Sequence, residues 1–113
     1  MTVKDVRDAL LTVTDNVYHY KASPNVKTNY ILWGETGTSA TFSADDEIDT
    51  IVIGGELYYY TNTEYDPVFD RICRVFDDHD IAWTLINIGY DDTLGQIVYT
   101  MEWRIVCGKG AIY

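Results

Sequence analysis

The stretch that decides the fold is QIVYTMEWRIV, residues 96–106. Apolar and aromatic side chains occupy every second position from Ile97 to Ile105, and Thr100, Glu102 and Arg104 fall between them. Successive side chains of a strand point to opposite faces of its sheet, so this period-two pattern predicts a strand with one buried face. It is the clearest strand signal in the chain.

The residues before this strand predict its neighbours in the sheet. Residues 81–90 predict a hairpin partner, because the intervening 91–95, DDTLG, has the composition of a hairpin loop. Residues 48–61 are strongly β-prone and predict a long strand, with Ile51, Ile53, Leu57 and Tyr59 on one face. The pair Gly54-Gly55 within it fits either a two-residue turn or a bulge, and we favour one long strand.

Two helices and two short strands complete the predicted elements. Residues 2–14 carry apolar side chains at helical spacing after Thr2, and residues 67–78 do so after the Asp66-Pro67 start signal. Residues 17–20 and 30–33 predict short strands, the second ended by Gly34 and a connection over 35–39.

These elements predict an α+β fold, with a mainly antiparallel sheet of about five strands and two helices packed on one face. The other face would carry Tyr58, Tyr60 and Val52. Residues 1–106 form a single domain in this reading. Residues 107–113 form a C-terminal tail that is either disordered or in contact with a neighbour.

Charge and composition exclude several classes of function. The formal net charge of the 113 residues is -10, and no run of basic residues is present to hold phosphates, which argues against gripping nucleic acid or an anionic membrane. Cys73 and Cys107 lack zinc-site spacing and predict free thiols in a reducing compartment. We expect neither a signal peptide nor a membrane helix.

Candidate catalytic or metal-binding residues are few. The clusters at 77–80 (DDHD), 91–92 and 45–47 carry carboxylates, but each lies on one short segment, where a solvated helix end or loop is the simpler interpretation. His19 has no nucleophile marked by a motif, and no phosphate-binding loop is present. We therefore expect no enzyme activity, no metal and no cofactor.

The tyrosines are the feature most suggestive of binding. Ten tyrosines and three tryptophans exceed what one core of this size needs, and both residue types are enriched at protein interfaces. Two other interpretations stay open: Tyr58–Tyr60 simply occupy both faces of a twisted strand, or stacked rings bind sugars or bases.

Several segments resemble the tail-terminator, or tail-completion, proteins that join head and tail in long-tailed bacteriophages and in prophages of Gram-positive bacteria. They are 17–22 (VYHYKA), 30–35 (YILWGE), 60–67 (YTNTEYDP), 81–83 (IAW) and 99–103 (YTMEW). The resemblance reaches about Trp103 and excludes the end of the chain.

The resemblance implies a non-enzymatic structural protein of the virion tail, assembled in the bacterial host cytoplasm. Copies would form a ring, commonly a hexamer, that caps the tail tube protein, meets the head connector protein and leaves a channel for DNA without binding it specifically. The expected contacts are the 35–39 segment with Glu35, Thr36 and Gly37, the 91–95 loop with Asp91 and Asp92, and the tyrosines Tyr58 and Tyr60.

Two further hypotheses belong to other classes. An acidic DNA mimic would inhibit a host nucleic-acid enzyme, and it predicts carboxylates in rows at phosphate spacing. A small hydrolase or metal-dependent enzyme would use residues 77–80 and predicts tight binding of a divalent cation.

Overall fold

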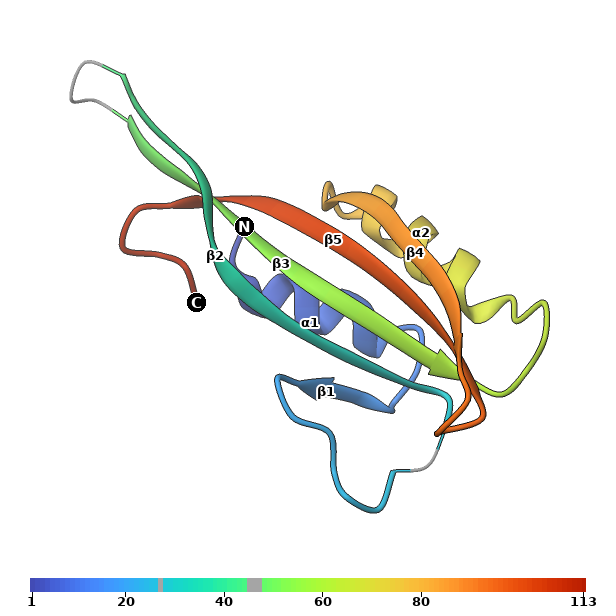
Figure 1. Cartoon of the computed structure of the whole chain (residues 1–113). Helices are drawn as coiled ribbons and strands as arrows, with labels where there is room; N and C mark the ends of the chain where they lie inside the picture. The colour runs from blue at the N-terminus through green and yellow to red at the C-terminus, as the bar shows by residue number, and fades with distance from the viewer. Residues whose placement is uncertain (27, 45–47) are drawn as a thin grey trace.

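The described part of the chain forms two helices and five strands in the predicted order. The computed structural model describes residues 1–26, 28–44 and 48–113, and for residues 39–44 and 48–49 it describes the backbone alone. The elements are α1 (Val3–Leu11), β1 (Val17–His19), β2 (Tyr30–Ala44), β3 (Ile48–Thr61), α2 (Val68–Asp78), β4 (Ala82–Asp91) and β5 (Gln96–Gly108) (Figure 1).

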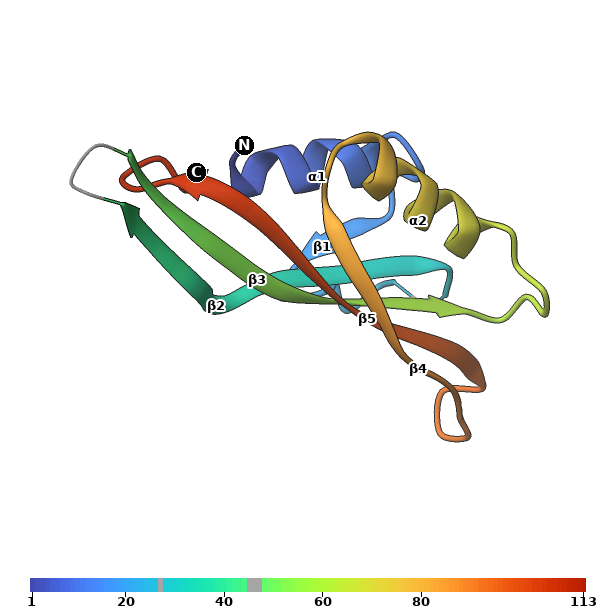
Figure 2. The ribbon, with the colours of Figure 1, turned by 90° about the horizontal axis from the view of Figure 1, so that it is seen from above.

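The strands form one five-stranded sheet among the described residues, in the order β1-β2-β3-β5-β4. Neighbouring strands are antiparallel, except that β1 runs parallel to β2. Both helices lie over the same face of this sheet (Figure 2). The predicted α+β class, the mainly antiparallel sheet and the placement of the helices on one face are confirmed.

Each helix buries one apolar stripe against the sheet. In α1 the carboxylate of Asp5 accepts the backbone N–H of Thr2 at 2.7 Å, which satisfies a donor at the helix start. The helix ends at Leu11, earlier than predicted, and the Thr12 hydroxyl bonds back to Ala9 O at 2.6 Å. Helix α2 buries its stripe in the same way, with Phe69, Ile72 and Phe76 inside.

Strand β3 is one continuous strand, as we favoured, and its glycine pair does not turn the chain. Gly55 lies opposite Trp103 of β5, a fully buried residue. A Cβ at Gly55 would collide with the indole of Trp103 and with the carbonyl oxygen of Gly34. Glycine is therefore needed here because the backbone approaches a large core side chain.

The prediction that β2 ends at Gly34 is wrong. The strand continues to Ala44, and its pairing with β3 runs from Tyr30 opposite Tyr60 to Ala44 opposite Ile48. Register shifts between Glu35 and Gly37 and between Thr38 and Ala40 mark two bulges, which break the period-two pattern that reveals a strand.

The long β2–β3 hairpin gives the molecule an elongated shape. Strand β5 pairs with β3 only as far as Thr50, so the ends of β2 and β3 project beyond the rest of the sheet (Figure 1). The principal extents are 52 × 25 × 23 Å.

The C-terminal residues pack against the chain's own first helix. Strand β5 runs past the predicted boundary at Val106, and Cys107 is buried. The carbonyl of Ile112 then accepts the backbone N–H of Val3 at 2.7 Å. The segment 107–113 thus belongs to the domain and is not a separate tail.

Candidate interaction surface

The sheet face away from the helices, called the open face below, carries a row of tyrosines. Tyr58 and Tyr60 lie on it, because Tyr59 between them is buried under the helices. The rings of Tyr30 and Tyr60 stack with centroids 4.7 Å apart, and Tyr18 meets Tyr30 edge-on at 6.1 Å. The predicted aromatic surface exists, and its rings partly cover one another.

The hydroxyls of Tyr58 and Tyr60 remain protonated near neutral pH. A hydrogen bond from Tyr58 to the Glu56 carboxylate, 2.7 Å long, raises the pKa of Tyr58 to about 12, with burial as the next cause. Burial raises the pKa of Tyr60, and the charge of Asp91 raises it further. The Tyr58 hydroxyl thus uses its one hydrogen within the chain, on the Glu56 carboxylate.

A hollow of about 110 Å³ opens on the same face. Its lining includes Tyr20, Leu32, Gly34, Glu56 and Tyr58. The Tyr20 hydroxyl donates to the carbonyl of Glu35 at 2.8 Å, which fixes this ring over Gly34. The hollow therefore has two tyrosines and a carboxylate in its lining.

Strand β4 presents an apolar edge to solvent. It is the last strand of the sheet, and Ile86, Ile88 and Tyr90 are 50%, 54% and 65% exposed. Edge strands are usually protected from pairing by charges, proline or bulges. Within Ala82–Asp91 the only charged residue is Asp91, at the very end, and a bulge lies at Ile86.

This edge is a surface that sequence analysis missed. Residues 81–90 are almost entirely apolar, and such a run ordinarily indicates a strand buried on both faces. The hairpin link to β5 predicted one neighbour correctly. The absence of a second neighbour depends on the strand order, which no local pattern shows.

The predicted contact residues Glu35, Thr36 and Gly37 lie in β2 and not in a loop. Glu35 is engaged inside the chain: its side chain is 10% exposed and its Oε1 lies 2.6 Å from Nε2 of His19. Burial alone would raise the pKa of Glu35, but hydrogen bonds, including that from His19, lower it overall. Thr36 lies beside the hollow and donates to Gly54 O at 3.4 Å.

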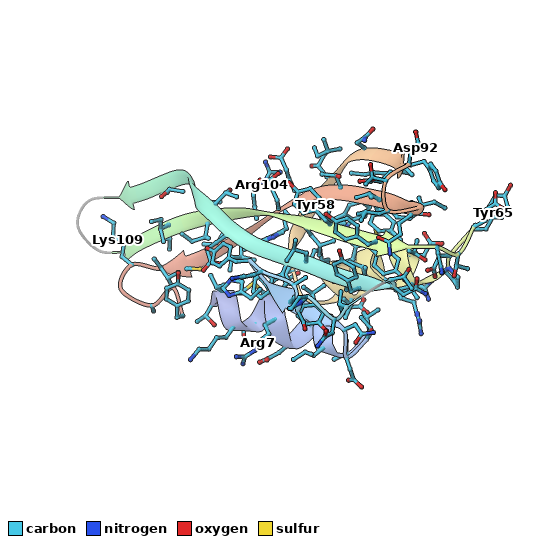
Figure 3. All side chains as sticks on the ribbon, turned by 60° about the horizontal axis from the view of Figure 1, so that its bottom comes forward. Arg7, Tyr58, Tyr65, Asp92, Arg104 and Lys109 are labelled. Carbon is cyan, nitrogen blue, oxygen red and sulfur yellow. The ribbon has the colours of Figure 1, made fainter. Side chains whose placement is uncertain are left out.

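Of the other predicted loop residues, Asp91 ends β4 and Asp92 follows it in the β4–β5 turn, where Figure 3 labels Asp92. Oδ1 of Asp91 accepts the backbone N–H groups of Thr93 and Leu94 at 2.9 and 3.0 Å, so it holds the turn. Asp92 is exposed. Among the predicted residues, the fold brings Asp91 close to the open-face tyrosines and places Glu35 on the helix side.

Asp66 is the carboxylate that most resembles a catalytic group, since it is 8% exposed and lowered in pKa. Burial alone would raise the pKa of Asp66, but hydrogen bonds from Val68 N–H, Thr61 and Tyr59 lower it overall. These bonds are 2.9, 2.7 and 2.7 Å long and occupy both oxygens. The group therefore ties β3 to the start of α2.

Two residues of the acidic segment at the end of α2 likewise make structural bonds. Asp77 Oδ1 accepts Nε1–H of Trp83 at 2.8 Å, and Nδ1 of His79 donates to Val75 O at 2.8 Å. Over the described ranges, no three His, Cys, Asp or Glu side chains converge as metal ligands. The 45–47 cluster lies outside the described residues.

The two cysteines are free, and burial raises the pKa of Cys73 to about 11, so its thiol stays protonated. Among the described residues, no helix has the length and apolar character needed to cross a membrane.

Comparison with known proteins assigns no family to the chain. No protein-family model matches the chain, and no curated protein is significantly similar to it.

Proposed function

We propose that this chain is a non-enzymatic assembly subunit that joins copies of itself, sheet edge to sheet edge, into a closed ring. The observation that carries the proposal is β4, an outer strand whose apolar side chains and backbone groups face solvent. Unpaired strand edges recruit a strand from another chain, and fully burying a large apolar side chain contributes about 1.5–3 kcal/mol.

The opposite edge of the sheet supplies the complementary strand. Strand β1 pairs only with Ile31–Trp33 of β2, so within the described residues the outer edge of β2 from Gly34 to Ala44 has no strand neighbour. A contact between two different edges is heterologous, and repeating it by rotation builds a ring.

Strand directions favour this contact. Strand β4 runs antiparallel to β5 and therefore parallel to β3, while β2 runs antiparallel to β3. Rotation about a ring axis preserves the component of strand direction along that axis, so if the strands run mainly along it, β4 of one copy would meet β2 of the next antiparallel. The joined sheets would then continue the mainly antiparallel pattern of the single chain.

The biological role that fits such a ring is that of a phage tail terminator, in line with the sequence resemblance. The first feature that supports this role is the net charge of -10, because an acidic surface would repel a DNA backbone passing through the ring. The second feature is the open face, which the edge-to-edge contacts do not use and which can therefore contact the tail tube or the head connector. We propose a hexamer, as is common in the resembled family.

The experiment compares the wild type with Ile88→Lys, because a lysine on an edge strand opposes pairing. Analytical ultracentrifugation and electron microscopy, on the concentrated protein and on its mixture with the tail-tube protein of the same genome, should show rings or capped tubes for the wild type. Ile88→Lys should remain monomeric and cap no tubes.

Leu11→Lys is the matched control, since Leu11 is 43% exposed on α1, away from β4. It should assemble as the wild type does. A wild type that stays monomeric even with the tube protein, or an Ile88→Lys variant that assembles normally, would contradict the proposal.

A further inference from the structure

The carboxylate of Glu56 is held in place and lacks a cationic partner within the described chain. It accepts the Tyr58 hydroxyl at 2.7 Å. The ion pairs among the described residues are Arg7–Asp8 and His19–Glu35, and neither includes Glu56. One phenol therefore orients this carboxylate without neutralising it.

A second carboxylate lies directly across the sheet. Glu56 of β3 is the register partner of Glu102 of β5. Like charges directly opposite each other destabilise a strand pair. Arg104 lies two residues further along β5, on the same face as Glu102, and forms no ion pair among the described residues. Neither Glu56 nor Glu102 therefore has a cationic partner among the ion pairs of the described residues, and a bound cation would stabilise both.

The walls of the hollow suit a planar cation. Tyr20 and Tyr58 line it, and aromatic faces attract guanidinium groups, which also stack on them. Its volume of about 110 Å³ is several times the roughly 10–15 Å³ of cavity volume that one water needs. The head of an arginine side chain therefore fits, with Glu56 as its hydrogen-bond acceptor.

We infer that this hollow binds the guanidinium group of an arginine side chain presented by a partner protein of basic surface. A second copy of this chain is a poor source, because on this face the described residues of its strands β3, β4 and β5 carry Glu56, Glu102 and Asp91 against one cation, Arg104. Figure 3 shows Arg104 and Tyr58 on the side of the sheet away from Arg7 and α1. The inference stands apart from ring assembly, which uses the sheet edges.

The probe is a short peptide, acetyl-Gly-Arg-Gly-amide, titrated into the isotopically labelled protein and followed by two-dimensional NMR. The matched probe replaces arginine by citrulline, which has nearly the same shape and no charge. The arginine peptide should shift the backbone amides of Gly34, Glu56 and Tyr58 in a saturable manner. The citrulline peptide should leave them unchanged.

Two variants test the residues. Glu56→Gln removes the charge-assisted hydrogen bond and should weaken the arginine peptide about tenfold or more. Tyr20→Leu removes one aromatic wall and should weaken it several-fold. Asp92→Asn, which removes an equal charge from the exposed β4–β5 turn, should change the affinity less than twofold.

Equal shifts from both peptides, shifts centred away from the hollow, or an unchanged affinity in Glu56→Gln would overturn the inference. Unshifted spectra with the arginine peptide would do the same. These results would leave the ring proposal unaffected, because its test measures the assembly state of the protein alone and with the tube protein.

Discussion

Asp66 shows how much one residue contributes to this fold. Its carboxylate accepts hydrogen bonds from Tyr59, Thr61 and the N–H of Val68, and so joins β3 to α2. Asp66→Ala would leave two buried hydroxyls without their acceptor, and we expect it to lower the free energy of unfolding by about 2–4 kcal/mol. Urea denaturation followed by circular dichroism measures this.

Asp70→Ala is the control. Asp70 is exposed in the first turn of α2, so its loss should lower the free energy of unfolding by less than about 1 kcal/mol.

The pH dependence of stability gives a second test of Asp66. The pKa of folded Asp66 is lowered, so its contribution is present above the unfolded value of about 3.9 and is lost as pH falls through the folded pKa. The stability gap between wild type and Asp66→Ala should therefore shrink in acid, and a constant gap would contradict this.

At the scale of elements, the pairing of β3 with β5 depends on a glycine. Gly55→Ala would force a methyl group into Gly34 O and the indole of Trp103. The carbonyl of Gly34 belongs to a paired strand and cannot move without disturbing the sheet. We therefore expect the free energy of unfolding to fall by more than about 2 kcal/mol. Gly89→Ala is the control, because its nearest contact is the Asn87 side chain at 3.3 Å, which can move. Thermal denaturation should give a lower melting temperature for Gly55→Ala than for Gly89→Ala, and equal melting temperatures would contradict this explanation.

Periodicity predicted the elements that follow one regular pattern. The helical stripes of α1 and α2 and the alternation in β5 reproduce which side chains are buried, because each depends only on local geometry. Strand β2 was predicted too short for a physical reason. Two bulges interrupt its alternation, and Gly34 is required by the ring of Tyr20 above it, not by a turn.

The candidate surface was predicted in part. Tyr58 and Tyr60 were placed on the open face from the alternation within β3, which is again local. The hollow depends on Tyr20 folding over Gly34 from another segment, and the exposed edge depends on β4 being outermost. Both arise from contacts distant in sequence, so no single stretch of the chain reveals them.

At the scale of the whole molecule, net charge opposes the proposed assembly. Copies that each carry -10 repel one another, while the apolar side chains of β4 attract. Salt shortens the Debye length from about 10 Å at 0.1 M to about 3 Å at 1 M, so it weakens repulsion and leaves burial intact. Light scattering should show more assembled wild type at high salt and no such gain for Ile88→Lys. Dissociation by salt would indicate a polar interface.

The three tryptophans occupy three distinct environments, which makes the unmodified protein its own optical sensor. Trp83 lies on β4 and donates to Asp77 at 2.8 Å, whereas Trp103 is buried and donates to the Glu56 carbonyl at 3.1 Å. The indole N–H of Trp33 is buried without a hydrogen-bond partner among the described residues. A change in the emission of Trp83 would therefore report contact at the sheet edge, and one in Trp33, which lines the hollow, would report its occupation, so fluorescence of single-tryptophan variants separates the two events.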